Sequence, residues 1–330
     1  MAQTDKRTIS IIGVGDIMLG TNYPSPDYLP VDDGKKLLAQ VNTLLREADI
    51  TFGNLEGAIL DQGPTLKTHC QNCYAFRMPE QLANNLVTAG FDIISIANNH
   101  IRDFGAAGYH NTLRVLNALG IHAAGLTTVP SVSFEREGIH YGFAAFAPNV
   151  GTVDIRDLNQ AQTIVRQLAE RNDIVIVSFH GGAEGPEHQH VTRKTEHYYG
   201  EDRGNVYAFA HKVIDAGADI VFGHGPHVSR AVERYQDRFI AYSLGNFCTY
   251  GRFSLKGPKG FAPIIKVKVT PQGEFVTAQI IPIIQHKWGK VTRDPQKQAI
   301  ERIRQLTRAD FPEGSLNIDK NGLITEQEMN

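Results

Sequence analysis

Short apolar runs rich in β-branched residues alternate with segments of helical spacing, and this alternation constrains the fold more than any other feature of the chain. Thr8–Val14, Asp92–Ala97 and Ile174–Phe179 are runs of the first kind. Ala106–Leu119 is a segment of the second kind, and Gly120 supplies its stop signal. Strands that alternate with helices of this length predict an α/β domain in which helices cover a sheet.

The same alternation continues along most of the sequence. Further strands are expected at Ile50–Phe52, Val132–Phe134, Ile139–Ala145 and Ile220–Phe222, and further helices at Lys35–Arg46, Pro79–Ala89, Asn159–Arg171 and Val206–Ala216. The later part is expected to hold four strands and one helix, at Val228–Arg234, Phe239–Ser243, Pro263–Val269, Glu274–Pro282 and Pro295–Thr307. Consecutive strands without helices between them indicate mixed sheets. No linker divides the sequence, so we expect residues 1–330 to form one domain.

Charge and cysteine content exclude several classes of protein. Lys and Arg total 33 and Asp and Glu total 35, a net charge of −2 that argues against a nucleic-acid partner held by a broad basic face. No apolar run is long enough for a transmembrane segment. Cys70 and Cys73 form a C-x-x-C pair without a second pair for structural zinc, so free or loosely paired thiols are favoured over a redox motif.

The first residues contain no apolar secretory segment. The sequence as written therefore predicts a cytoplasmic protein. A periplasmic or secreted protein is expected instead if a signal peptide preceded Met1 and was trimmed.

Polar residues follow five of the expected strands at their carboxyl ends. They are Asp16, Glu56, Asn99 with His100 and Asp103, His180 with Glu184, and His224 with His227. In open α/β sheets this edge is where ligands bind. Carboxylate, amide and imidazole groups suit zinc, manganese or iron. Each residue alone is typical of a turn, a loop carboxylate or a hydrogen-bonded imidazole, but five such positions at one edge predict a metal centre.

Six short motifs at these positions resemble the CapA-type capsule-synthesis proteins, a family associated with poly-gamma-glutamate and similar to the calcineurin-like metallophosphoesterases. The motifs are Gly15–Gly20, Asn54–Glu56, Ala97–His100 with Asp103, His180–Glu184, Gly223–Val228 and Tyr242–Phe247. The resemblance covers residues 8–247 and leaves 260–330 for C-terminal strands, a helix and a hairpin. It implies a metallophosphoesterase-like fold, a layered α/β/β/α sandwich with mixed sheets.

The resemblance also implies roles for single residues. One or two divalent ions (Mn, Zn or Fe) would be held by Asp16, Glu56, Asn99, His180, His224 and His227, with Glu56 in the bridging place. His100 would serve as the catalytic acid or base, Asp103 would hold its tautomer, and Asn246 would line the same pocket.

The sequence departs from the family pattern at three places. Met18 stands where a second ligand, a histidine, is usual in the phosphoesterases. Gly225 stands where a further histidine is common, and Gly182 follows His180 without the aromatic residue often seen nearby. Met18 predicts that one of the two metal positions is weak or absent.

Two functions of different kinds remain open at this point. The first is a metal-dependent hydrolase that acts on an anionic small molecule or polymer, at a phosphoester or a glutamyl amide bond. Its substrate would be bound by Arg77, Arg102, Arg252, Glu184 and Asn246. The three arginines are candidates because guanidinium groups match phosphate and carboxylate. The second is a non-catalytic, metal-containing accessory or binding protein of capsule or envelope polymer assembly. The residues also leave the oligomeric state open.

The C-terminal residues allow two interpretations. Asn317, Asp319, Asn321 and Glu328 echo the spacing of a calcium-binding loop. Asn321-Gly322 between two short apolar runs is typical of a tight β-hairpin turn, and the hairpin is our prediction.

Overall fold

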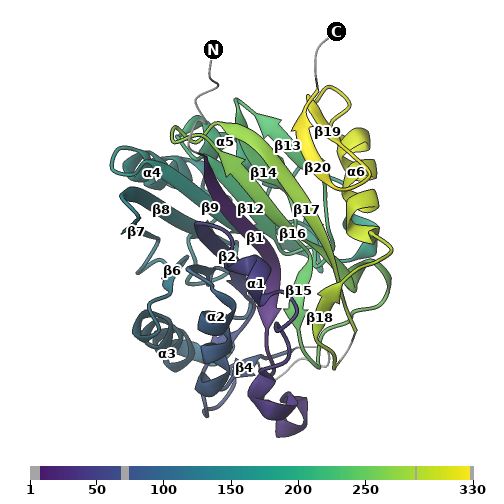
Figure 1. The fold of residues 1–330 in the computed structure, drawn as a ribbon. Coiled ribbons are helices and arrows are strands. Elements are labelled where there is room, and N and C mark those ends of the chain that lie inside the picture. The colour runs from purple at the N-terminus through teal and green to yellow at the C-terminus, as the bar shows by residue number, and fades with distance from the viewer. Residues whose placement is uncertain (1–7, 68–73, 287, 328–330) are drawn as a thin grey trace.

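Two large mixed sheets lie face to face in the computed structural model, which describes residues 8–67, 74–286 and 288–327 (Figure 1). The main path of the first sheet runs through β19 (Leu316–Ile318), β20 (Leu323–Glu326), β17 (Phe275–Gln285), β16 (Phe261–Val269), β1 (Ile9–Met18), β2 (Ile50–Leu55), β5 (Ile93–Ser95) and β6 (His122–Ala124). Off this path, β1 also pairs with β15 (Asn246–Thr249) and β17 with β18 (Val291–Arg293).

The second sheet contains six strands. Its order is β13 (Val232–Tyr235), β14 (Arg238–Ala241), β12 (Ile220–His224), β9 (Ile174–His180), β8 (Ile139–Phe146) and β7 (Ser131–Arg136). Two small ladders pair β3 (Ala58–Ile59) with β4 (Arg77–Met78), and β10 (His197–Tyr198) with β11 (Glu201–Asp202).

Most helices cover the outer faces of the two sheets. The α-helices are α1 (Asn42–Leu45), α2 (Asn84–Ala89), α3 (Gly105–Ala118), α4 (Leu158–Ala169), α5 (Val206–Asp215) and α6 (Gln298–Asp310). Short 3₁₀ turns are η1 (Pro26–Tyr28), η2 (Val31–Gly34), η3 (Glu80–Ala83), η4 (Pro186–His188) and η5 (Gly257–Lys259). No helix in the described ranges is long and apolar enough to cross a membrane.

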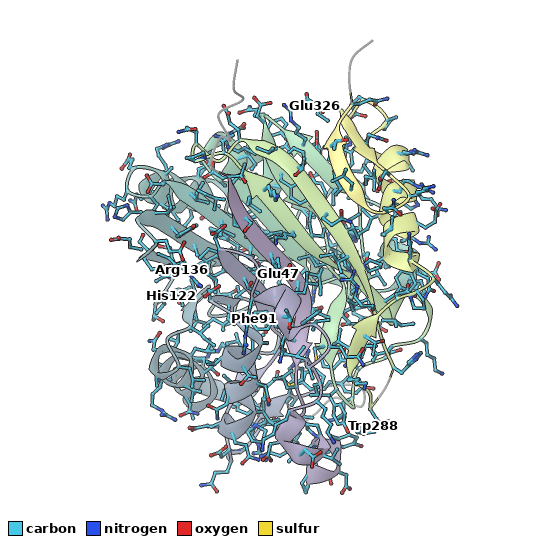
Figure 2. The ribbon with its side chains drawn as sticks, viewed as in Figure 1. Glu47, Phe91, His122, Arg136, Trp288 and Glu326 are labelled. Atoms are coloured by element: carbon cyan, nitrogen blue, oxygen red, sulfur yellow. The ribbon has the colours of Figure 1, made fainter. Side chains whose placement is uncertain are left out.

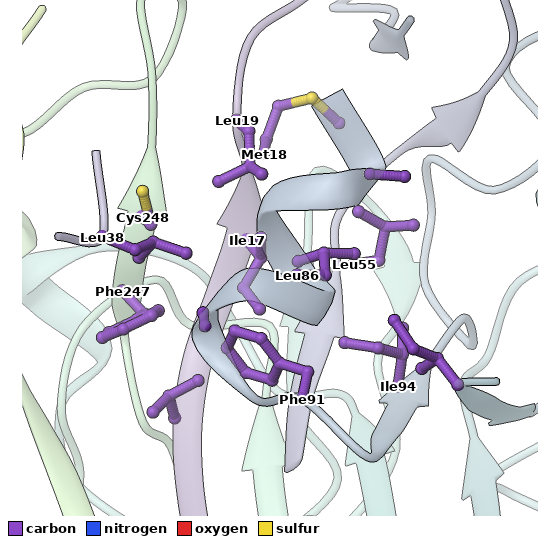
Figure 3. Close-up of a cluster of buried hydrophobic side chains, with 14 of the residues drawn as sticks. Ile17, Met18, Leu19, Leu38, Leu55, Leu86, Phe91, Ile94, Phe247 and Cys248 are labelled. Atoms are coloured by element: carbon purple, nitrogen blue, oxygen red, sulfur yellow. The ribbon is translucent and has the colours of Figure 1, made fainter. Parts of the chain in front are cut away.

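Strand β1 shows how the layers arise from side-chain alternation. Ile9 and Ile11 face the core between the two sheets, whereas Ile12 and Val14 face the core under α1, α2 and α3. Figure 3 shows part of this second core, where Phe91 lies among side chains from β1, β2 and β15. A third core joins the far face of the second sheet to α4 and α5. The layers therefore run helix, sheet, sheet, helix, and the expected α/β/β/α sandwich with mixed sheets is confirmed.

Side chains also join the two sheets at their β6 and β7 edges. The His122 ring stacks on Phe134 of β7 with 4.0 Å between centroids, and Arg136 forms an ion pair with Asp92 (Figure 2). The two sheets are therefore joined along this edge as well as through the core between them. These contacts fix how the strand ends of one sheet lie relative to the strand ends of the other.

The predicted helix at Lys35–Arg46 is largely wrong. Most of its apolar residues are buried as expected, but only α1 forms, and the chain before it makes isolated turns. The carbonyl of Leu37 accepts a hydrogen bond from Val291 N at 2.9 Å, so this backbone is used in a tertiary contact. The predicted strand at Val228–Arg234 begins only at Val232, while the predicted first strand extends four residues further, to Met18.

The predicted C-terminal hairpin is confirmed. β19 and β20 pair antiparallel, and Gly322 has φ +84°, a value that favours glycine. Asp319 uses one carboxylate oxygen to accept hydrogen bonds from the backbone of Asn321 and Leu323, at 2.7 and 2.9 Å. Glu328, on which the calcium-loop interpretation depended, lies outside the described residues, as do Cys70 and Cys73.

Candidate metal centre

The carboxyl ends of four parallel strands meet where the two sheets face each other. In the first sheet, Asp16 of β1 pairs in register with Asn54 of β2. In the second sheet, His224 of β12 pairs in register with His180 of β9. Asp16 then joins the sheets, because its two carboxylate oxygens lie 3.2 Å from His224 Nδ1 and 2.8 Å from His227 Nδ1.

The backbone around Asp16 is adapted to this position. The register of β1 shifts against both neighbouring strands near Asp16. The Asp16 N–H donates to the carbonyl of Gly245 at 2.8 Å. A Cβ at Gly15 would lie 2.0 Å from the same carbonyl oxygen, so only glycine permits this approach.

A buried amide holds two carboxylates together. Asn54 Nδ2 donates to Asp16 Oδ1 at 2.8 Å and to Glu56 Oε2 at 2.6 Å. Asn98 Nδ2 donates to Asn54 Oδ1 at 3.1 Å and fixes the orientation of that amide. Neither asparagine had a predicted role, although the period-two rule places residues 54 and 56 on one face of a strand and could have identified Asn54.

His180 lies between a carboxylate and an arginine. Its Nδ1 is 3.4 Å from Glu56 Oε2, and its Nε2 is 3.2 Å from Arg203 Nη2. Arg203 is 2% exposed and also lies 3.2 Å from Glu184 Oε1. No pattern in the sequence pointed to Arg203, because it comes from an irregular segment 23 residues beyond His180.

His227 adopts a left-handed backbone conformation, with φ +56°. Such a conformation in a residue other than glycine costs free energy and persists only where the surroundings enforce it. Here the His227 carbonyl accepts from Asn246 Nδ2 at 3.3 Å, and the ring is held by Asp16. Asn246 therefore supports the turn that carries His227.

Burial and ion pairing act in opposite directions on the carboxylates. Burial raises the pKa of Asp16, but hydrogen bonds and charge from His224 and His227 outweigh it and hold the pKa well below its ordinary value. Burial likewise raises the pKa of Glu56, yet electrostatic attraction and hydrogen bonding to His180 bring it to about 2. Both side chains are therefore anionic at neutral pH.

For the imidazole of His227, burial and ion pairing act on the pKa in the opposite directions to those for the carboxylates. Burial lowers its pKa, but the hydrogen bond and charge of Asp16, followed by the charges of Glu184 and Glu56, raise it to about 9. In this arrangement a protonated imidazole neutralises part of the carboxylate charge.

The predicted pair of His100 and Asp103 is in contact. His100 Nδ1 lies 2.8 Å from Asp103 Oδ2, and the backbone N–H of Phe76 donates to the same oxygen at 2.8 Å. Lys67 Nζ, which had no predicted role, forms an ion pair with Asp103 Oδ1 at 2.6 Å. Asp103 is thus fixed on both oxygens and can orient the His100 ring.

A cavity of about 450 Å³ opens over these groups. Its walls include Asn99, His100, Glu184, Arg203, His227 and Arg252, together with the aromatic residues Tyr74, Phe76, Tyr198, Tyr199 and Phe253. Arg77 and Arg102 are not among the lining residues. Arg77 contacts Asn22 and Gly63, and Arg102 lies over the ring of Tyr109.

Met18 is buried away from these polar groups. It belongs to the core under the helices, and its Cε lies close to Gly57 (Figure 3). The position that usually carries a second histidine ligand in the phosphoesterases therefore contributes to the hydrophobic core.

The donor groups fit a divalent ion in kind, although their side chains are not arranged around one. Within the described ranges, no three His, Cys, Asp or Glu side chains form a ready group for a metal ion. Several buried polar atoms nevertheless have no hydrogen-bond partner in the described structure, namely Glu56 Oε1, Asn99 Oδ1, His180 Nδ1, His224 Nε2 and Asn246 Oδ1. Buried polar atoms without partners are costly, and atoms of these types are metal ligands.

Comparison with known proteins agrees with this fold. The chain is 24% identical over 270 residues to the capsule biosynthesis protein CapA of Bacillus anthracis, an alignment that covers 74% of this chain and 60% of that protein. It is 32% identical over 248 residues to a probable polyglutamine synthesis accessory protein of Mycobacterium tuberculosis, covering 66% and 60%. The alignments thus span about three fifths of the length of these relatives.

A crystal structure from Staphylococcus aureus, assigned provisionally as a 5′-nucleotidase and solved in complex with α-ketoglutarate, has the same fold. Its TM-score is 0.51 at 17% identity, with 91% of this chain and 58% of that chain covered. The likeness shows that the two chains share this fold. Residues 10–250 match the family model of the bacterial capsule synthesis protein PGA_cap, and the chain belongs to this family.

Proposed function

We propose that this protein is a metal-dependent hydrolase of capsule or poly-gamma-glutamate metabolism, acting on a phosphoester or a glutamyl amide bond. The observation that carries the proposal is the contact of Asp16 with His224 and His227 across the two sheets. This contact lies beside a cavity that exposes His100 and Arg252 to a ligand.

The ligand set would be drawn from Asp16, Glu56, Asn99, His180, His224 and His227. An ion bound there would supply Lewis acidity and a water nucleophile at neutral pH. Binding would require the Asp16–histidine hydrogen bonds to be exchanged for metal bonds. The buried atoms without partners would then find one.

In this proposal, His100 moves the proton. Of the two neutral tautomers of His100, the one with its proton on Nδ1 donates to Asp103 and leaves the lone pair on Nε2. When protonated, Nε2 can donate to the leaving oxygen or nitrogen of a substrate in the cavity. Lys67 pairs with Asp103 and holds it in place, and Arg252 can pair with an anionic group of the substrate.

Turnover is the test of this function. The protein is assayed with Mn²⁺ or Zn²⁺ on phosphomonoesters, phosphodiesters and glutamyl peptides. We expect His100→Ala to lower kcat by about 10²–10⁴-fold, the usual share of a general acid, while metal binding is retained. His140→Ala, an exposed histidine that pairs with Asp173, is the matched control and should keep full activity.

A second candidate function is supported by Met18. Met18, at the position of a usual metal ligand, belongs to the hydrophobic core. The centre would then hold a metal ion that helps to bind a polymer but does not hydrolyse it. Stoichiometric metal with no turnover on any of these substrates would favour that accessory role and contradict the hydrolase.

A further inference from the structure

Arg203 is a buried cation in contact with His180, one of the candidate ligands. One terminal nitrogen, Nη2, lies 3.2 Å from His180 Nε2 and 3.2 Å from Glu184 Oε1. Glu201 lies 3.5 Å from Nη1. The side chain is 2% exposed and lines the cavity.

The chemistry of this contact fixes the tautomer of His180. A guanidinium group has only donors, so Nε2 of His180 must be the acceptor. A neutral imidazole has one lone pair and one N–H, and the proton is therefore on Nδ1, the nitrogen that faces Glu56. Metal coordination needs a free lone pair. In this arrangement the Nε2 lone pair is taken by Arg203, and Nδ1 carries the proton.

Metal-binding histidines usually have the opposite environment. Their second ring nitrogen donates to a carboxylate or a carbonyl, which raises the basicity of the binding nitrogen. Arg203 places a donor where an acceptor is usual. If Nδ1 bound the ion, Nε2 would carry a proton and would face the N–H of Arg203. If Nε2 bound the ion, Arg203 would have to leave.

We propose that Arg203 competes with the metal ion for His180, and that an anion in the cavity relieves this competition by drawing the guanidinium away. This inference rests on the proposed metal centre. It adds that anion binding regulates the metal affinity of that centre. An oxyanion or carboxylate that pairs with Arg203 frees the His180 lone pair. By linkage, metal and anion then bind with positive cooperativity, each increasing the affinity of the other.

The backbone around Arg203 favours a motion of the side chain alone. Its N–H donates to the Glu196 carbonyl at 2.8 Å, and its carbonyl accepts from Gly182 N at 2.9 Å. Glu196 is in turn held by the buried Arg230, 2.7 Å away. The segment is therefore anchored while the guanidinium, between Glu184 and Glu201, can change partners inside the cavity.

The first test measures Mn²⁺ affinity by equilibrium dialysis on the full chain. Arg203→Met should tighten Mn²⁺ binding about tenfold, the fold-change expected when one competing charged hydrogen bond is lost. A merely structural arginine would give weaker binding on removal. Arg252→Met is the matched control: it removes a cation from the same cavity, but Arg252 contacts Tyr28 and Tyr74 instead of His180.

The second test measures coupling to anions. Sulfate and acetate, added in separate experiments, should each tighten Mn²⁺ binding by the wild-type protein several-fold. A larger effect of sulfate identifies a tetrahedral oxyanion as the partner of Arg203, and a larger effect of acetate identifies a carboxylate. Arg203→Met should abolish the coupling, and Arg203→Lys should retain part of it. If the loss of any positive charge in the cavity were responsible, Arg252→Met would tighten Mn²⁺ binding as much as Arg203→Met does. In that case the anions would still tighten Mn²⁺ binding in Arg203→Met.

A third readout needs neither metal nor activity. Nitrogen-15 NMR of the metal-free protein should show His180 protonated on Nδ1 in the wild type and redistributed between the two nitrogens in Arg203→Lys. Equal or weaker Mn²⁺ binding by folded Arg203→Met overturns the competition and leaves the proposed hydrolase standing. Failure of wild type and variants alike to bind Mn²⁺ or Zn²⁺ overturns both.

Discussion

Asn54 holds two carboxylates of the metal-free centre together. Two buried carboxylates, Asp16 and Glu56, share its amide nitrogen at 2.8 and 2.6 Å. Both are fully buried, and like charges in such surroundings repel strongly. The amide donates to both at once, so it lowers the cost of placing them beside each other.

Asn54→Asp should therefore destabilise the metal-free protein by about 3–5 kcal/mol, because a third buried carboxylate replaces the shared donor. A divalent ion should restore part of this loss, since it binds the folded state with more carboxylate ligands. Urea unfolding with and without Mn²⁺ measures both effects. Asn84→Asp, at an exposed residue, should change stability by less than about 0.5 kcal/mol. A small loss at Asn54 without metal would show that the carboxylates do not need the amide.

The strand ends that carry the candidate residues could be predicted from the sequence, but most of the partners of these residues could not. His100 and Asp103 are three residues apart, and their contact follows from local geometry. Arg203 reaches His180 through an irregular segment, and Lys67 reaches Asp103 across 36 positions of the chain. Such contacts depend on how loops fold back over strand ends, which no local periodicity encodes. Arg77 and Arg102 were candidates by residue type only, and their positions depend on the same loops.

At the scale of elements, Asp219 ties the amino ends of three neighbouring strands. It precedes β12, accepts from Val175 N of β9 at 2.8 Å and pairs with Arg238 Nε of β14 at 2.8 Å. Burial raises its pKa to about 6, against the lowering effects of the Val175 N–H and of Arg238. The folded state therefore binds this proton more tightly than the unfolded state does.

The sign of the resulting pH effect follows from linkage. Between the unfolded value of 3.8 and the folded value of about 6, the folded state holds more protons, so stability falls as pH rises through this window. Asp219→Asn cannot ionise. The free energy of unfolding of the variant relative to the wild type should therefore rise by about 2 kcal/mol between pH 4.5 and pH 7. Urea unfolding at both pH values checks this, and effects of other groups cancel in the difference.

Asp154→Asn is the control for this measurement. Burial raises the pKa of Asp154, but hydrogen bonds and charge from Arg156 outweigh burial and lower it, so the titration of Asp154 lies below the window. The stability difference for this variant should be the same at pH 4.5 and pH 7. An equally flat difference for Asp219→Asn would show that Asp219 keeps an ordinary pKa in the folded protein.

Strands and long helices could be predicted, and short elements that depend on tertiary contacts could not. The predictions for α3, α4 and α5 agree within one or two residues, because each has a buried stripe and a stop signal. The apolar spacing at Lys35–Arg46 matched a helix equally well, yet its backbone pairs with Val291, 254 positions after Leu37. β15 was missed because its pairing with β1 joins segments 230 positions apart at Asp16 and Asn246.

At the scale of the whole molecule, the site exists only while the two sheets stay aligned, and aromatic rings in the core between them secure this alignment. Phe52 of β2 stacks on Phe222 of β12 with 5.3 Å between centroids and an interplanar angle of 7°. The same ring lies 5.6 Å from His224, two residues further along β12. Phe52 thus supports a candidate ligand from the opposite sheet.

Phe52→Ala should therefore have two effects. It should lower stability by about 3–5 kcal/mol, as expected for a large cavity in a core. It should also weaken Mn²⁺ binding by about tenfold, because His224 loses the ring that holds it in place. Phe239→Ala separates these effects, since Phe239 is equally buried between the sheets but pairs with Ile220 at the amino end of β12, away from the site. It should lower stability by a similar amount and leave Mn²⁺ affinity unchanged. Urea unfolding and equilibrium dialysis on both variants make the comparison. Equal losses of Mn²⁺ affinity would mean that general stability governs the site, whereas a loss confined to Phe52→Ala would show that the alignment of the two sheets at this ring positions His224.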